Sequence, residues 1–367
     1  MQIVYLDQNK WIDLARARQD PERDPDIHAL IAPLDRAVRR GALAIPLTMS
    51  NIYETHKIND PRRRRDLAYI QAILSQGLVF RARRARLTEE FGAILRQAAG
   101  LAPAVLPPRW FLSGVFLEAV ADLGEGLVIP EAMLSAIQAR PADMLFSYLA
   151  DTPEDTRLEG VHRYTAGSQA LCEAIETRRA QHRDEPVSMR RKIYSVLQAV
   201  DEIDLLRRVA ASAGYAWTST SDMDQVLFRR VIREAPALHV EREITLRLEA
   251  QDRAISHNDL RDMQAFATVV PYAELVVAEN QFSSLARQAG RHQADIDFDQ
   301  RLEARRWPAG FEWRSAAAAT HMRRRKHPVD VRRPGLMDQF PGSAGSAAHE
   351  ASATCAAPFA AVETGLV

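Results

Sequence analysis

The sequence predicts an α/β protein in which a parallel sheet, flanked by helices, is interrupted by a large all-helical insertion. Three observations support this prediction. The first hundred residues alternate short apolar runs with amphipathic helical spacing, which is the pattern of βαβ units. From about Thr88 to Leu248 the spacing is helical throughout, with no convincing strand. A strand signal then returns at Leu275–Ala278, so the sheet is expected to resume after the helical segment.

Short strands are expected where apolar and β-branched residues stand in runs between turn signals. The N-terminal half contains three such runs, at Ile3–Leu6, Leu43–Leu47 and Leu78–Phe80. Amphipathic spacing predicts helices between them, at Trp11–Arg18, Ile27–Arg40 and Arg62–Ser75. In the C-terminal half, a helix is expected through Met263–Val270, ahead of the returning strand, and a weaker strand signal lies at Phe311–Trp313.

The composition divides the chain into four parts. The N-terminal half of the α/β domain is expected at residues 1–87 and its C-terminal half at 251–315, on either side of a helical insertion at 88–250. A basic stretch and a tail occupy 316–367. From about Pro334 this tail is rich in Gly, Ala and Ser, a composition typical of disordered segments.

Length and charge set limits on the class of protein. With 367 residues, 47% of them hydrophobic, the chain can bury a full core. Lys plus Arg and Asp plus Glu each number 48, so the net charge does not indicate a nucleic-acid partner. No apolar run approaches the roughly 18 residues of a membrane span and no signal peptide is evident, so a cytoplasmic protein is expected. Cys172 and Cys355 predict neither a disulfide framework nor a zinc site.

Acidic residues are expected to meet at one end of the sheet. Asp7 directly follows the first strand, where an unpaired carboxylate is costly to desolvate. Glu54 lies just past the second strand, and Glu279 directly follows the strand at Leu275–Ala278. Asp259 and Asp262 are three residues apart on a helix and share one face. Ligands of parallel α/β sheets bind beyond the carboxyl ends of the strands. Clustered carboxylates repel one another unless a cation neutralises them, and oxygen-only sites suit Mg²⁺ or Mn²⁺.

Helix capping is the alternative role for some of these acids. Ser50 or Asn51 is expected to cap the helix that carries Glu54, which would place Glu54 in its first turn. Glu54 would then close a capping box with Asn51, and Asp259 would do the same with Ser256.

The acidic residues and their surroundings resemble the PIN domain family of metal-dependent nucleases. The resemblance lies in the opening "YLDQN", in the acid of the helix after the second strand, and in the run "DMQAFATVVPYAELVVAEN". It covers residues 1 to 85 and 255 to 315 and implies a PIN-like fold. It implies catalytic and metal-binding roles for Asp7, Glu54, Asp262 and Glu279, with Asp259 as an additional metal ligand.

Two departures from the family pattern stand out. The fourth acid, Glu279, is a glutamate where aspartate is usual, and about 160 helical residues separate the two halves of the domain. Asn9 matches a polar residue that often follows the first acid, and with Ser50 it is expected to support the acids or the phosphate by hydrogen bonds.

The resemblance implies hydrolysis of phosphodiester bonds with Mg²⁺ or Mn²⁺ as the cofactor, most readily in single-stranded RNA. Nothing in the spacing distinguishes RNA from DNA. Arginines of the α/β half are expected to track the nucleic-acid backbone by charge: Arg62, Arg63, Arg64, Arg65, Arg83 and Arg84. A role as a toxin or in defence, with an inhibitor or antitoxin protein as partner, fits the resemblance, and a homodimer is compatible with it.

Two other classes of protein remain open at this point. The first is a catalytically inactive PIN-like module that binds RNA or a protein partner without cleavage, with Glu279 reflecting loss of the usual aspartate. The second is a phosphatase with an aspartyl nucleophile, which normally has a second Asp where this chain has Asn9.

Overall fold

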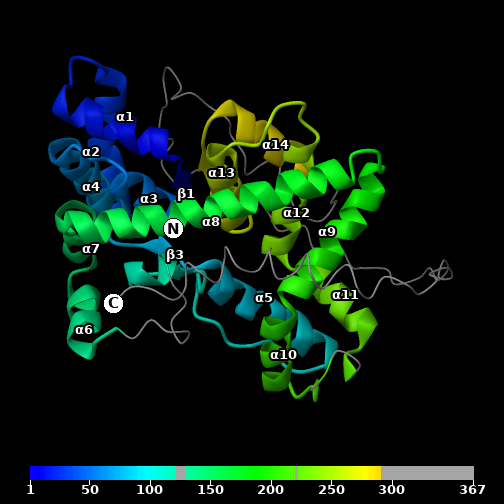
Figure 1. Ribbon diagram of the computed structural model, residues 1–367. Helices are drawn as coiled ribbons and strands as arrows, with labels where there is room; N and C mark the ends of the chain where they lie inside the picture. The colour runs from blue at the N-terminus through cyan, green and yellow to red at the C-terminus, as the bar shows by residue number, and fades with distance from the viewer. Residues whose placement is uncertain (121–128, 218, 220–221, 291–367) are drawn as a thin grey trace, which may run out of the picture.

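The computed structural model describes residues 1–120, 129–217, 219 and 222–290. Within them the protein is mostly helical, with a small parallel sheet, and so belongs broadly to the α/β class (Figure 1). The strand expected at 311–313 and the tail expected at 316–367 lie outside the described residues.

The sheet has the strand order β2-β1-β5, and all three strands are parallel. Its central strand, β1 (Gln2–Leu6), is buried at four of its five residues and pairs with β2 (Leu43–Ala44) on one side and β5 (Leu275–Val277) on the other. Two strands close in sequence and one more than 200 residues later therefore form one sheet. The resumption of the sheet after the helical segment, which the sequence predicts, is confirmed.

A second sheet, of two strands, is joined to the chain segment just after β2. Leu47 forms a parallel bridge to Val79 in β3 (Val79–Phe80), and β3 pairs antiparallel with β4 (Leu112–Ser113). The expectation of no strand between residues 88 and 248 was therefore wrong. A strand of two residues is too short to show alternation in the sequence, and packing positions it, because Phe111 stacks on Tyr272 with ring centroids 4.5 Å apart.

Four helices surround the N-terminal strands: α1 (Gln8–Gln19), α2 (Pro25–Arg39), α3 (Met49–His56) and α4 (Pro61–Ser75). The N-cap of α3 is Thr48, and Asn51 completes a capping box with it. The expected capping by Ser50 or Asn51, and the capping box between Asn51 and Glu54, were therefore wrong. The reason is that Leu47 still pairs with the β3 segment, so Thr48 is the first residue free to start the helix, and Glu54 lies in its second turn.

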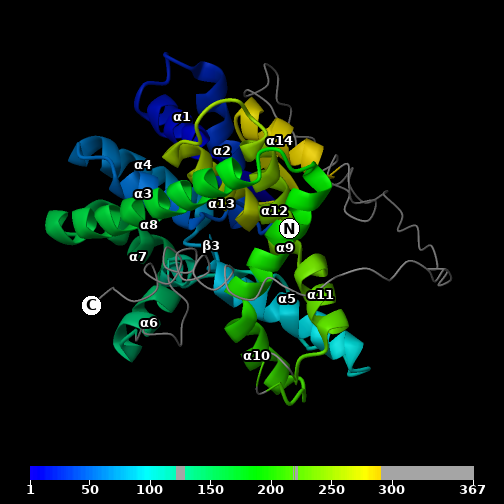
Figure 2. The same ribbon diagram turned by 45° about the vertical axis from the view of Figure 1, so that its right-hand side comes forward.

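The helical segment comprises α5 (Arg83–Ala98), the 3-10 helix η1 (Phe116–Ala119), α6 (Glu131–Ala139), α7 (Pro141–Asp151), α8 (Glu154–Gln181), α9 (Val187–Asp201), α10 (Ile203–Ser212), α11 (Gln225–Glu234) and α12 (Pro236–Glu249). The chain then forms α13 (His257–Val269), β5 and α14 (Asn280–Gly290). The long helix α8 runs across the molecule, as both views show (Figures 1 and 2). In the described part of the chain, none of the helices has the length and apolar character needed to cross a membrane.

The helices of this segment share their cores with the sheet. Helix α7 packs on α4, so that Leu145 and Leu149 join the same buried cluster as Trp11. Helices α8 and α12 pack on α13, and Ile244 lies in one buried cluster with Tyr5 of the central strand. Helices α5, α10 and α11 build a further cluster of their own with the start of α12. The helical segment therefore helps to hold the sheet and α13 in place.

Candidate functional site

Asp7 and Glu279 lie at the same end of two neighbouring parallel strands. Asp7 follows β1 at once and is the N-cap of α1, where its carboxylate accepts a hydrogen bond from the backbone N–H of Gln8 at 2.8 Å. Its own backbone N–H donates to the carbonyl of Val277 at 2.9 Å, so the pairing of β1 with β5 extends to this residue. Glu279 stands two residues beyond the end of β5 and is exposed.

Asn9 links the two segments. It lies in the first turn of α1, and its side-chain amide donates to Oε1 of Glu279 at 2.5 Å. Because Asp7 caps the helix that carries Asn9, the turn from strand to helix fixes both side chains relative to β5. The structure thus brings Asn9 to the acid that the sequence expected it to support.

Asp262 of α13 shares the electrostatic environment of these two acids. Burial and the negative charges of Asp7 and Glu279 together raise the pKa of Asp262 to about 8, with burial the largest cause and Arg261 acting in the opposite direction. Burial also raises the pKa of Asp7, the N–H of Gln8 opposes this, and the charge of Glu279 adds to it. The charge of Glu279 therefore disfavours the ionised forms of Asp7 and Asp262, and the charge of Asp7 disfavours that of Asp262, as like charges without a nearby cation do.

Glu54 has an arginine as its ionic partner. The guanidinium of Arg261 forms an ion pair with the Glu54 carboxylate, and it also donates to the carbonyl of His257 at 3.2 Å and to the side chain of Asn258. Arg261 is buried and lies 5.5 Å from the ring centroid of Tyr53. Glu54 therefore lies beside the α13 acids, with its charge compensated by the residue next to Asp262.

Asp259 is engaged in local structure. Its carboxylate accepts two hydrogen bonds from Arg253, at 2.7 and 2.5 Å, and closes the capping box of α13 with Ser256. Burial raises its pKa, but the hydrogen bonds from Arg253 and Ser256 outweigh this and leave the pKa of Asp259 below its usual value. The capping box between Asp259 and Ser256, which the sequence allowed as an alternative, is confirmed.

Ser50 lies between the two helices that carry these acids. It is buried in the first turn of α3, and its hydroxyl donates to the backbone carbonyl of Arg261 at 3.4 Å. The structure therefore shows Ser50 joining α3 to α13, beside both Glu54 and Asp262.

The acids of this site offer oxygen ligands for a metal ion, but their side chains are not arranged as a complete coordination sphere. Within residues 1–120, 129–217, 219 and 222–290, no group of three or more His, Cys, Asp or Glu side chains is arranged so that it could hold a metal ion. The charges of Asp7 and Glu279 raise the pKa of Asp262, and the side chains of all three residues supply only oxygen atoms. Excess negative charge on oxygen ligands is the chemistry that suits a hard divalent cation.

The arginines at the start of α4 divide into two kinds. Arg62 and Arg63 are exposed, and their backbone N–H groups bind the N-cap Asp60. Arg64 is buried and donates to the carbonyl of Ile58 at 2.8 Å. Arg65 is exposed and pairs with a carboxylate of α7 at 2.6 Å. Of this group, Arg62 and Arg63 best suit contact with a polyanion.

The second arginine group lies away from the exposed surface. Arg83 forms ion pairs with Glu202 at 2.5 Å and with Glu241 at 2.6 Å, which tie the start of α5 to α10 and α12. Arg84 is half-buried and lines a cavity between the helices. Arg83 therefore ties helices of the interior together, and because its partners lie more than 100 positions away, no local pattern of the sequence indicates this role.

Sequence reasoning missed Arg261 as a residue of the site. It stands directly before Asp262 in "HNDLRD", and on a helix neighbouring positions point in different directions, so a cluster on one face would omit it. Only the packing of α13 against α3 shows that its side chain reaches Glu54.

No family model matches the chain, and neither a curated protein nor a solved structure does. The residues of the site are therefore the basis on which a function is proposed.

Proposed function

We propose that the protein is a metal-dependent nuclease that hydrolyses phosphodiester bonds. The observation that supports this most is the shared environment of Asp7, Asp262 and Glu279 at the carboxyl end of the parallel sheet, where the charge of Glu279 raises the pKa of Asp7 and the charges of both raise the pKa of Asp262. We also propose that the α/β part has a PIN-like fold and belongs to the PIN domain family, because the sequence around these acids resembles that family.

Asp7 and Asp262 would hold Mg²⁺ or Mn²⁺, with Glu279 beside them. When bound, such an ion activates a water for attack and neutralises charge on the scissile phosphate. Asn9 holds Glu279 in place through its hydrogen bond at 2.5 Å. Because the pKa of Asp262 is about 8, this residue carries a proton through much of the neutral range and must release it before its carboxylate can act as a ligand.

Glu54 and Arg261 have a second part in the proposed reaction. The ion pair with Glu54 holds the guanidinium of Arg261 next to Asp262. A guanidinium presents a planar set of donors that matches phosphate oxygens. Arg261 is therefore proposed to bind the phosphate of the substrate, with Glu54 as the residue that positions it.

Single-stranded RNA is the proposed substrate, since the sequence resemblance points to it. The exposed side chains of Arg62 and Arg63 offer positive charge for its backbone. We propose that the protein acts as a toxin or in defence and that an inhibitor protein blocks its activity.

A binding module without catalysis is the second candidate. Two observations favour it: among the described residues no three His, Cys, Asp or Glu side chains are arranged to hold a metal ion, and Glu54 is paired with an arginine. Such a module would bind RNA or a protein through the same surface and leave the phosphodiester bonds intact.

The test is a cleavage assay with labelled single-stranded RNA and DNA, in Mn²⁺, in Mg²⁺ or in chelator. The variant Asp7→Asn keeps a residue that can cap α1, so the fold is expected to persist. Asp20→Asn, which changes an exposed acid just after the same helix, is the matched control. Metal-dependent cleavage that Asp7→Asn abolishes and Asp20→Asn retains supports the nuclease. RNA binding without cleavage in every condition supports the module, and the absence of both contradicts both proposals.

A further inference from the structure

A group of uncharged polar side chains joins helices α1, α3 and α4 at the residue that follows Asp7. Its members are Gln8 of α1, Asn51 and Thr55 of α3, and Gln71 of α4. Thr55 and Gln71 are fully buried, and Asn51 is 1% exposed. The same three helices contribute residues to one buried apolar cluster: Trp11, Leu14, Ile52, Leu67 and Leu74. Polar groups buried beside apolar ones cost free energy unless they find hydrogen-bonding partners.

Hydrogen bonds connect the side chain of Gln8 to both other helices. Its Oε1 accepts from Nδ2 of Asn51 at 3.1 Å and from Nε2 of Gln71 at 3.5 Å. Its Nε2 donates to the hydroxyl of Thr55 at 3.3 Å. That hydroxyl has two acceptors for its own proton, Oε1 of Gln71 at 2.9 Å and the carbonyl of Asn51 at 2.8 Å. The group is therefore a closed network in which both amide groups of the glutamines are bonded.

This network fixes the turn that presents Asp7. The carboxylate of Asp7 accepts from the backbone N–H of Gln8 at 2.8 Å, and the backbone N–H of Asp7 donates to Val277 at 2.9 Å. Strand β5 therefore holds the turn on one side, and the side chain of Gln8 holds it on the other. The charge of Glu279 acts on Asp7, and like charges repel. The two attachments oppose the displacement of Asp7 that this repulsion favours.

We infer that Gln8 is a positioning residue of the proposed metal site and that Asn51, Thr55 and Gln71 hold it in place. The inference rests on the proposed function, because it assigns the residues that orient the ligand Asp7. Residues that orient metal ligands without touching the ion change the metal affinity about 10–100-fold when they are replaced. Because apolar groups of the same shape can replace a buried hydrogen-bonded pair at little cost in stability, the network contributes mainly to geometry.

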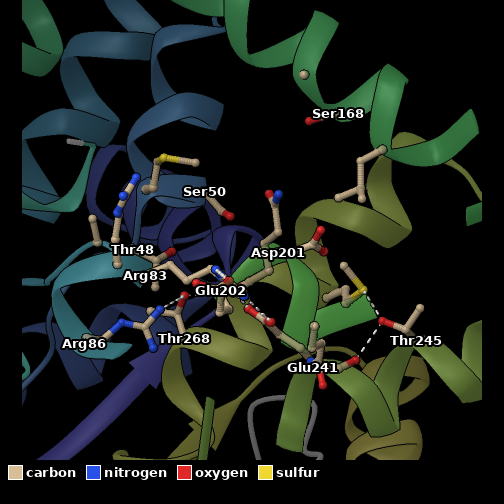
Figure 3. A pocket seen from close by; sticks show the side chains of 18 of the residues that line it. Thr48, Ser50, Arg83, Arg86, Ser168, Asp201, Glu202, Glu241, Thr245 and Thr268 are labelled. Carbon is tan, nitrogen blue, oxygen red and sulfur yellow. Dashed lines mark hydrogen bonds and ion pairs between the residues drawn. The ribbon is translucent and has the colours of Figure 1, made fainter. Parts of the chain in front are cut away.

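The test compares two substitutions at one position. Thr55→Val keeps the shape of the side chain and removes the hydroxyl that binds Gln8, whereas Thr55→Ser keeps this hydroxyl. Gln8→Met removes the amide itself. Thr268→Val is the matched control, because the Thr268 hydroxyl also donates to a carbonyl four residues earlier, at 2.8 Å, and accepts from a side chain, that of Arg86 at 3.2 Å (Figure 3).

The first measurement is the affinity of the full chain for Mn²⁺, by isothermal titration calorimetry without RNA. We expect Thr55→Val and Gln8→Met to weaken the binding of Mn²⁺ at least about tenfold. Thr55→Ser and Thr268→Val are expected to change it less than about threefold. Thermal unfolding in chelator checks that each variant folds.

The second measurement is hydrogen–deuterium exchange in chelator, which does not depend on a metal. The backbone N–H groups of Lys10 and Trp11 donate to the carbonyl of Asp7, at 2.8 and 3.3 Å, and so report on the turn. We expect these groups to exchange at least about fivefold faster in Thr55→Val and Gln8→Met than in the wild type. In Thr55→Ser and Thr268→Val their exchange should be unchanged.

The outcomes separate this inference from the proposed function. If the wild type binds Mn²⁺ and Thr55→Val and Gln8→Met bind it equally tightly, the inference is overturned while the nuclease stands. The same holds if Thr268→Val weakens the binding as much as Thr55→Val. If the wild type binds no Mn²⁺, the proposed function is contradicted and the exchange rates alone decide. Unchanged rates in Thr55→Val and Gln8→Met would then show that the network does not fix Asp7.

Discussion

Two carboxylates of α13, one turn apart, lie in opposite electrostatic environments. At the start of the helix, Asp259 is held by Arg253 and Ser256, and its pKa lies below the usual value. One turn later, Asp262 faces the end of the sheet, where burial and the charges of Asp7 and Glu279 raise its pKa to about 8. The two residues have the same side chain and are three positions apart, so the difference lies in their partners. Asp259 is thereby compensated by its own surroundings, whereas the charge of Asp262 is not, which is the basis of the metal-binding role proposed for it.

The largest expected effect that follows from this difference is on catalysis. Asp262→Asn should lower metal-dependent cleavage by at least about 100-fold, because a carboxylate that neutralises the bound ion is lost. The measurement is the single-turnover cleavage rate at saturating Mn²⁺, beside the affinity for uncleaved RNA. A variant with more than about a tenth of the wild-type rate would remove Asp262 from the proposed set of ligands.

The next effect is on stability and concerns Asp259, at the start of the helix. Asp259→Asn breaks the pair with Arg253 and weakens the capping box, so the free energy of unfolding at neutral pH should fall by about 1–3 kcal/mol. Because the folded pKa is lowered, the loss should shrink as the pH falls below about 4, where the wild-type carboxylate is itself protonated. Urea denaturation across pH measures this, with the exposed Asp252→Asn as the control.

Asp262 should show the opposite dependence of stability on pH. Its folded pKa of about 8 lies above that of an unfolded aspartate, so the folded protein holds a proton that the unfolded chain has released. The stabilisation is complete below about pH 4 and is lost as the pH rises through about 8. In chelator at pH 9, Asp262→Asn should therefore be more stable than wild type by about 1 kcal/mol or more. Equal pH dependence of the two proteins would contradict the environment described for this residue.

The smallest expected effect concerns the exposed arginines. Replacing both Arg62 and Arg63 by Ala should weaken RNA binding only a few-fold at moderate salt, and the slope of affinity against salt concentration should fall by about two. Fluorescence anisotropy over a salt series measures both quantities. Arg183→Ala with Arg229→Ala removes the same charge from exposed positions on the helical segment and should leave the slope unchanged.

Features encoded by neighbouring residues were predictable from the sequence. The three parallel strands and the position of Asp7 follow from apolar runs that stop at a polar residue, and the capping box of Asp259 follows from a Ser three positions before it. These features depend on periodicity and capping, which act over a few positions.

Features that depend on packing were not predictable in this way. The pair of Glu54 with Arg261 joins residues more than 200 positions apart, and it exists because α3 and α13 lie against each other. The same holds for the ion pairs of Arg83 with Glu202 and Glu241, which lie more than 100 positions from it. The N-cap of α3 is Thr48 and not Ser50 or Asn51, because Leu47 forms a bridge to Val79, and no local pattern reveals that contact.

The central strand gains its last partner late in synthesis. One edge of β1 pairs with β2 about forty residues on, whereas its other edge waits for β5, and the backbone N–H of Ile3 then donates to Glu274, 271 positions away, at 2.6 Å. A chain still emerging from the ribosome therefore carries an open strand edge through most of its translation, which is a condition that favours wrong pairing. The same delay keeps Asp262 and Glu279 away from Asp7, so these three acids can meet only once the chain has been made as far as the start of α14.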